Sequence, residues 1–239
     1  PQSAGTSDLN ITSIDGSNTL SSDLPDTIIG MPNTIEESVH LREIFRSAAQ
    51  EAGRNADDIK FMVFFTFGIG KTHREALNRR REMESSEDFP ERLRHLSMLL
   101  GVPISETDID EPLTSIHLSN LRQNPQFSKS AQAIRLAKEG YSPLDIIAHG
   151  VLDNTPGVVG TAEDVADYLQ EWIESEAADS FALVADRLSD ALSDFVAQVI
   201  PILQKRGFRP EGYMGNTLRE NMNIDYQIGV DPRILNETE

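Results

Sequence analysis

Residues 60–67, KFMVFFTF, decide the fold class of this chain. They form a nearly continuous apolar, aromatic run of strand length, a pattern typical of a strand that is buried on both faces. Gly68 and Gly70 end the run, and Thr72 with Glu75 has the spacing of a helix capping box. A buried strand, a turn and a capped helix are the unit of parallel α/β folds, so the sequence predicts an α/β protein.

Three further strands are predicted along the chain, at 26–30, 157–160 and 179–184, which gives four in total. Capped or periodic helices are expected to follow each strand, and Pro201 should kink the last of them or start a new turn there. We expect a polar N-terminal loop at 1–25, one domain at 26–226 and a tail at 227–239. The middle of the domain, about 86–157, has helical patches at 91–100, 129–139 and 143–149 and is interpreted as a helical insertion.

Composition excludes several classes of function. The 239 residues carry 21 Lys and Arg against 39 Asp and Glu, a formal charge of −18, so the chain lacks the basic surface that nucleic acids and anionic membranes need. There is no cysteine, which removes disulfides, thiolate nucleophiles and Cys-type metal sites. No apolar run approaches the ~18–20 residues of a membrane span, and no signal peptide is visible. The expectation is a soluble, cytoplasmic protein.

Two glycine turns resemble phosphate-binding sites. Gly70-Lys71-Thr72 imitates the end of a P-loop, but Phe65 stands where the motif needs its first glycine, so a tight turn and a helix N-cap explain it better. Gly160-Thr161 precedes a helix and could bind an anion through unpaired N–H groups. An ordinary N-cap explains that turn at least as well.

The charged and histidine residues are expected to be mostly structural. The five histidines are scattered and show no zinc-binding spacing, and His149 is the one candidate pocket residue, although a surface position is favoured. Ten acids between Thr161 and Asp194 are interpreted as solvated helix faces. The run Arg79-Arg80-Arg81 is interpreted as the exposed side of a helix. No metal site is predicted.

Longer stretches resemble one family. The blocks VVGTAEDVADYLQEWIES at 158–175, AADSFAL at 177–183 and 192–222 resemble, in order and spacing, the C-terminal part of the bacterial-luciferase-like flavin monooxygenases. The group in question contains nitrilotriacetate monooxygenase component A, pristinamycin synthase and dibenzothiophene-sulfone monooxygenase. Segments 60–76 and 96–113 are also similar to that family.

The resemblance implies a (β/α)8 (TIM) barrel of which this chain is the C-terminal part. It implies reduced FMN as the cofactor, supplied by a separate NAD(P)H:flavin reductase, with O2 and a small organic molecule as substrates. The flavin carries the oxygen chemistry, and the protein positions the substrate and excludes water. The absence of cysteine does not conflict with this mechanism.

Gly5-Thr6-Ser7 is the predicted cofactor-binding site. Small residues, a hydroxyl and free N–H groups suit an anion-binding turn, although such tripeptides are common. The resemblance matches Ala4 to Ser7 to a family turn that holds the FMN phosphate, with Ser7 as its first candidate. The family's first four strands have no counterpart here, and residues 8–25 are longer and more polar than the helix expected at that place.

Two functional hypotheses remain open. The chain is either part of an FMN-dependent monooxygenase that is inactive without its missing half, or a non-catalytic remnant or interaction module that kept the half-barrel core. A half barrel leaves open strand edges and an uncovered apolar face, so a homodimer is expected. The sequence identifies neither the substrate nor any catalytic residue.

Overall fold

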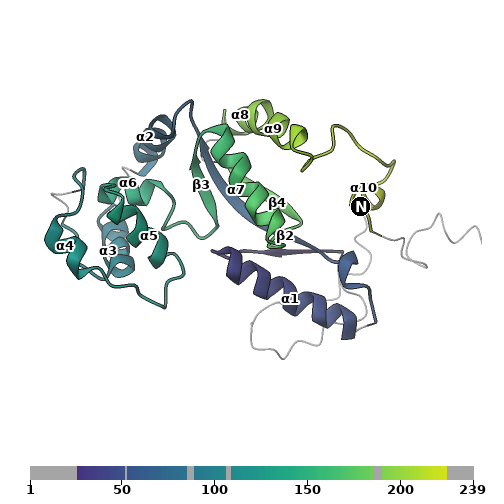
Figure 1. The fold of residues 1–239 in the computed structure, drawn as a ribbon, viewed down its shortest axis with the longest axis horizontal. Helices are drawn as coiled ribbons and strands as arrows, with labels where there is room; N and C mark the ends of the chain where they lie inside the picture. The colour runs from purple at the N-terminus through teal and green to yellow at the C-terminus, as the bar shows by residue number, and fades with distance from the viewer. Residues whose placement is uncertain (1–25, 52, 85–88, 106–108, 186–189, 225–239) are drawn as a thin grey trace, which may run out of the picture.

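The computed structural model describes residues 26–51, 53–84, 89–105, 109–185 and 190–224, and it has an α/β fold (Figure 1). The strands are β1 (Thr27–Gly30), β2 (Lys60–Ile69), β3 (Gly157–Gly160) and β4 (Ser180–Ala185). Their positions agree with the four predicted strands to within two residues. The helices, with one short 3-10 turn and one π segment, are α1 (Ile35–Glu51), η1 (Ala56–Asp58), α2 (His73–Glu84), α3 (Phe89–Leu100), α4 (Ser115–Asn120), α5 (Ser130–Lys138), α6 (Pro143–Ala148), α7 (Ala162–Glu174), α8 (Ala191–Asp194), η3 (Phe195–Val199), α9 (Ile200–Lys205) and α10 (Leu218–Asn221).

Strand β2 is the centre of an entirely parallel sheet. β1 pairs with its first half, Gly30 lying opposite Val63, and β3 pairs with its last residues, Gly160 lying opposite Ile69. β4 pairs along the middle of β2, not with β3. In a closed barrel the strands would follow one another in sequence order, so the position of β4 departs from that order.

The burial of β2 differs from the prediction that both of its faces are covered. Four apolar side chains on one face, those of Phe61, Val63, Phe65 and Phe67, are at most 2% exposed. The side chains between them, such as those of Met62 and Phe64, are only half-buried. Successive side chains of a strand point to opposite faces, so one face is packed and the other lacks an equal cover.

Helices α1 and α7 cover the packed face. α7 begins at a capping box in which Thr161 and Asp164 bond reciprocally, as predicted, and its Trp172 is 1% exposed. Trp172 packs with Phe61 and with α1, while Phe65 and Phe67 pack against α7 and the α8–α9 region. The aromatic run that predicts β2 therefore also supplies most of the core.

Four helices between β2 and β3 have a core of their own. Leucines of α3 pack with α5 and α6 around Ile146 and Ile147, which are fully buried. Helices α3, α5 and α6 lie at the predicted helical patches, whereas α4 was not predicted. No strand lies among the described residues of this region.

The last long helix changes its winding at Pro201, as predicted. η3 is a π-helical segment, in which the Ile200 N–H bonds to the Phe195 carbonyl five residues earlier, and α9 follows with Pro201 in its first turn. A proline lacks the N–H that would continue the α-helical ladder, so a change of hydrogen bonding at this point is expected. Gly207, with φ +81°, then ends the helix.

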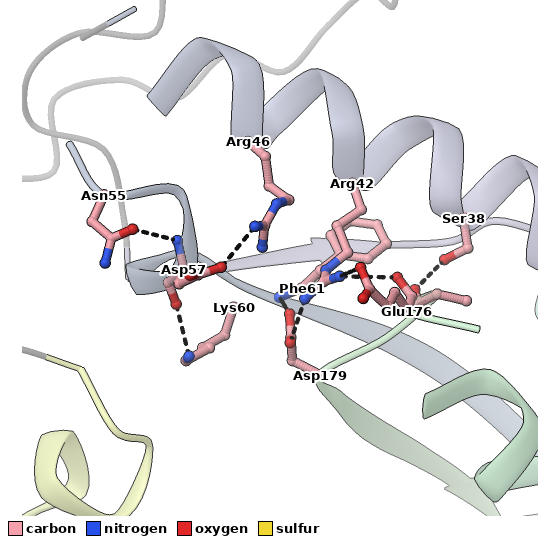
Figure 2. A network of polar contacts seen from close by, with 10 residues as sticks. Ser38, Arg42, Arg46, Asn55, Asp57, Lys60, Phe61, Glu176 and Asp179 are labelled. Atoms are coloured by element: carbon pink, nitrogen blue, oxygen red, sulfur yellow. Dashed lines mark hydrogen bonds and ion pairs between the residues drawn. The ribbon is translucent and has the colours of Figure 1, made fainter. Parts of the chain in front are cut away.

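A polar network fixes α1 to the amino ends of β2 and β4 (Figure 2). Asp179 accepts the Phe61 N–H at 2.8 Å and the Arg42 guanidinium at 2.7 Å. Ser38 is fully buried and donates to the Ala177 carbonyl at 2.6 Å. Through Asp179 and Ser38 the network joins segments more than 100 residues apart.

Candidate functional site

The carboxyl ends of β2 and β3 meet at one edge of the sheet, where open α/β proteins place their ligand sites. The Gly70 N–H donates to the Gly160 carbonyl at 3.0 Å, which holds the two strand ends together. α2 begins directly after β2 and α7 directly after β3. A Cβ on Gly70 would lie 2.4 Å from the Ala76 nitrogen, so this turn requires glycine.

A cleft of about 680 Å³ opens beside the carboxyl end of β2. Its volume lies in the range of small-molecule sites. One wall comes from the β2–α2 turn and α2, and the other from α8 and η3. The lining residues are Ile69, Gly70, Lys71, Thr72, Arg74, Glu75, Asn78, Arg79, Glu82, Asp190, Asp194 and Gln198.

Carboxylates already pair with the two arginines of the cleft. Arg79 lies 3.3 Å from Asp190 and 3.7 Å from Asp194, across the cleft. Arg74 contacts both carboxylate oxygens of Asp145, at 3.1 and 3.2 Å. Lys71 is exposed at the mouth. The described part of the cleft is therefore polar but nearly neutral, and it has no concentrated cationic surface for a phosphate.

Asp145 anchors α6 to α2. Its carboxylate is 7% exposed and also accepts from Arg81 at 2.7 Å. Burial by itself raises the pKa of Asp145, but the hydrogen bonds from Arg81 and Arg74 outweigh it and hold the pKa below its ordinary value of 3.8. Asp145 is thus a charged link between α2 and α6.

The two predicted turns of the described region are ordinary helix caps. Thr72 accepts the Glu75 N–H at 3.2 Å. At the other turn, Asp164 accepts the Thr161 N–H at 2.8 Å, and a Cβ on Gly160 would lie 2.6 Å from the same carboxylate. A carboxylate therefore occupies the place where Gly160-Thr161 could have held an anion. The third turn, Gly5-Thr6-Ser7, lies outside the described residues.

The interpretation of Arg79-Arg80-Arg81 as an exposed helix side was wrong. Arg80 is 6% exposed and donates to Asp153 at 2.9 Å, and the other two side chains are 14% and 24% exposed. Each arginine reaches a carboxylate on a different segment of the chain. Sequence reasoning missed these pairs because the partner carboxylates lie at least 29 residues away.

The preference for a surface position of His149 was also wrong. His149 is half-buried, and its Nε2 lies 3.2 Å from the Nε2 of His73, with Tyr141 stacked edge-on against the ring. Burial lowers the pKa of His149, and the neighbouring His73 lowers it further. No sequence spacing could reveal this pair, because the helical insertion separates its members by 76 residues.

Lys129 is a buried cation that the sequence did not single out. It is 7% exposed, and its ammonium donates to the carbonyls of Gly150, Asp153 and Thr155 at 3.0, 2.7 and 2.6 Å. Burial lowers its pKa to about 8, so it keeps its three protons at pH 7. Lys129 thereby fixes the loop that leads into β3.

The fold and the position of the cleft define a parallel α/β protein with its candidate site at the carboxyl ends of the strands. No family profile matches the chain. Among the curated relatives, a pristinamycin IIA synthase chain of Streptomyces pristinaespiralis is 33% identical over 180 residues, which are 74% of this chain and 41% of that protein.

Solved structures give the same relationship. EDTA monooxygenase from Chelativorans sp. BNC1 superposes with a TM-score of 0.63 at 28% identity, over 85% of this chain and 47% of that one. A riboflavin lyase with modified FMN and riboflavin gives a TM-score of 0.55 at 30% identity, over 84% of this chain and 43% of that one. The chain belongs to the luciferase-like monooxygenases. It spans 35–46% of the length of the curated relatives that it matches.

None of the described helices is both long and apolar enough to cross a membrane.

Proposed function

We propose that this chain is the C-terminal part of a flavin-dependent monooxygenase with a (β/α)8 barrel. Reduced FMN and O2 would oxidise a small organic substrate at the carboxyl ends of the strands. The observation that carries the proposal is the cleft beside Ile69 and Gly70, which lies where parallel α/β enzymes bind their ligands, in a chain of monooxygenase ancestry.

The described residues do not by themselves fit an FMN molecule. Arg74 and Arg79, the cations that could hold its phosphate, are paired with carboxylates, and the Gly160 turn is closed by Asp164. We propose Gly5, Thr6 and Ser7 as phosphate ligands, with Ser7 as the main one. The cleft would then supply one wall for flavin or substrate, and the remaining wall would come from another part of the barrel.

That requirement leads to the proposal that the chain alone is inactive. Its span of less than half the length of its curated relatives supports this proposal. A complementary half would cover the half-buried side of β2, which includes Met62 and Phe64. A separate flavin reductase would supply the reduced flavin.

We also propose that the isolated chain forms a homodimer. Apolar side chains remain exposed on two of the three strands that flank β2, since Ile29 of β1 is 55% exposed and Leu183 and Val184 of β4 are 36% and 39% exposed. Open strand edges with apolar side chains favour pairing with a second chain. Light scattering should give twice the mass of the chain, and a stable monomer at working concentration would contradict this proposal.

Oxygen consumption tests the proposed activity. Reduced FMN, regenerated by a flavin reductase, is mixed with the chain alone and with the chain plus the segment of EDTA monooxygenase that lies outside the matched region. Substrate-dependent oxygen uptake is expected only in the mixture. Efficient turnover by the chain alone contradicts the need for a second half, and the absence of uptake in both cases favours the non-catalytic remnant.

A further inference from the structure

Two imidazoles and a phenol converge where α2 begins and where α6 begins and ends. These two helices lie next to each other (Figure 1). The Nε2 atoms of His73 and His149 are 3.2 Å apart, and the Tyr141 hydroxyl lies 3.3 Å from the His73 Nε2. All three residues are half-buried, so a small solute can reach them. His149 also caps α6, but the proposed flavin function does not use this cluster.

The hydrogen bonds assign a proton to one nitrogen of His149. Its Nδ1 lies 2.7 Å from the Asp145 carbonyl oxygen, which can only accept, so Nδ1 carries the proton. In the neutral ring the Nε2 then presents a lone pair to His73.

The His73 Nε2 has two polar neighbours. If it donates to His149, the Tyr141 hydroxyl bonds elsewhere, and if it accepts the Tyr141 proton, two nitrogen lone pairs face each other at 3.2 Å. In the second arrangement a cation between the two nitrogens would replace this repulsion, since each Nε2 would then act as a ligand.

The distances from the His73 Nε2 to the His149 Nε2 and to the Tyr141 hydroxyl suit such a cation. Zinc binds imidazole nitrogen at about 2.0–2.1 Å, and two ligands of a tetrahedral centre are then about 3.4 Å apart. The observed separations of 3.2 and 3.3 Å are close to that value. A ligating histidine typically donates its other N–H to a carbonyl or carboxylate, which is the bond that His149 makes to Asp145.

We propose that His73, His149 and Tyr141 form a binding site for a divalent transition-metal ion such as Zn²⁺. The two Nε2 atoms and the phenol oxygen are the protein ligands, the phenol releases its proton to solvent on binding, and water completes the coordination. The described residues contain no group of three or more His, Cys, Asp or Glu that could hold a metal, so this site depends on the tyrosine as its third ligand. It should therefore bind more weakly than a four-ligand structural zinc site.

Calorimetric titration of the metal-free chain with Zn²⁺ tests the proposal, with Co²⁺ absorption as a second readout of tetrahedral coordination. One ion per chain is expected. His73→Gln and His149→Gln should each weaken binding at least tenfold, and Tyr141→Phe should weaken it less. His40→Ala and His95→Ala are the matched controls, because both histidines are exposed elsewhere on the chain.

Glutamine keeps a hydrogen-bonding group in place of the imidazole. The Gln variants therefore distinguish the loss of a metal ligand from the loss of a hydrogen bond between the two histidines. Zn²⁺ should also raise the melting temperature of the unchanged chain and of the controls, but not of the two Gln variants. The proposal is overturned if Zn²⁺ does not bind, if the Gln variants bind as well as the unchanged chain, or if a control variant loses the site. These results do not depend on flavin binding.

Discussion

At the amino ends of β2 and β4, charged side chains pair across elements and hold the strand ends to α1 (Figure 2), whereas the charged side chains at the carboxyl end of β2 line an open cleft of about 680 Å³. Asp179 illustrates the first arrangement and Lys71 the second. In (β/α)8 barrels, the fold that we propose for the whole protein, the amino end serves stability and the carboxyl end serves chemistry. The two ends of this sheet should therefore respond differently to substitution.

The largest loss of stability should follow Lys129→Met, which removes the ammonium at the start of α5 that holds the loop leading to the amino end of β3. The substitution leaves three carbonyls without their donor, and we expect the free energy of unfolding to fall by about 3 kcal/mol. Chemical denaturation measures the change. Lys138→Met, on an exposed face of α5, is the control and should cost less than about 0.5 kcal/mol. Equal effects of the two variants would contradict a structural role for Lys129.

A smaller loss is expected for Asp179→Ala at the amino end. The Phe61 N–H and Arg42 both lose their acceptor, so the free energy of unfolding should fall by about 2 kcal/mol. Asp179→Asn keeps an oxygen for the Phe61 N–H and should cost about half as much. If the alanine variant unfolds at the same denaturant concentration as the unchanged chain, the network is not a stabilising one.

At the carboxyl end, Lys71→Ala should change the free energy of unfolding by less than about 0.5 kcal/mol, because the side chain is exposed. The same variant, combined with the complementary half, should lose oxygen uptake several-fold if the cleft takes part in binding. A large loss of stability without any loss of activity would reverse the contrast between the two ends.

The smallest effect concerns pH. Because burial lowers the folded-state pKa of His149, the unfolded chain binds more protons between that lowered pKa and 6.5. Stability should therefore fall as the pH drops through that window. Melting temperatures between pH 7 and pH 5 measure the slope, and His149→Gln should flatten it. An equal slope in the variant would show that other groups cause the dependence.

The sequence predicts local features well and distant contacts poorly. The aromatic run of β2, the cap at Thr161 and the change at Pro201 each rest on neighbouring residues, and the structure confirms them. The burial of Arg80 and the His73–His149 pair depend on partners more than 70 residues away. Both arise because the helical insertion folds back onto α2. A contact between distant segments leaves no periodic signal in the sequence.

The unequal cover of the two faces of β2 has a similar origin. A strand that is covered on both faces and a strand that is covered on one face can have the same continuous apolar run. The run includes Met62 and Phe64, so it predicts burial that the described chain provides on only one face. Coverage is a property of the assembled fold and cannot be read from the run itself.

A titration with FMN shows whether this chain supplies one part of a flavin site. Flavin fluorescence is followed while the chain alone, and then the chain with the complementary segment of EDTA monooxygenase, is titrated into FMN. We expect weak or no quenching by the chain alone and saturable quenching by the mixture. Ser7→Ala should lower the affinity of the mixture for FMN at least tenfold. Tight binding by the chain alone, or no binding by the mixture, would contradict the claim that this chain supplies one part of a flavin site.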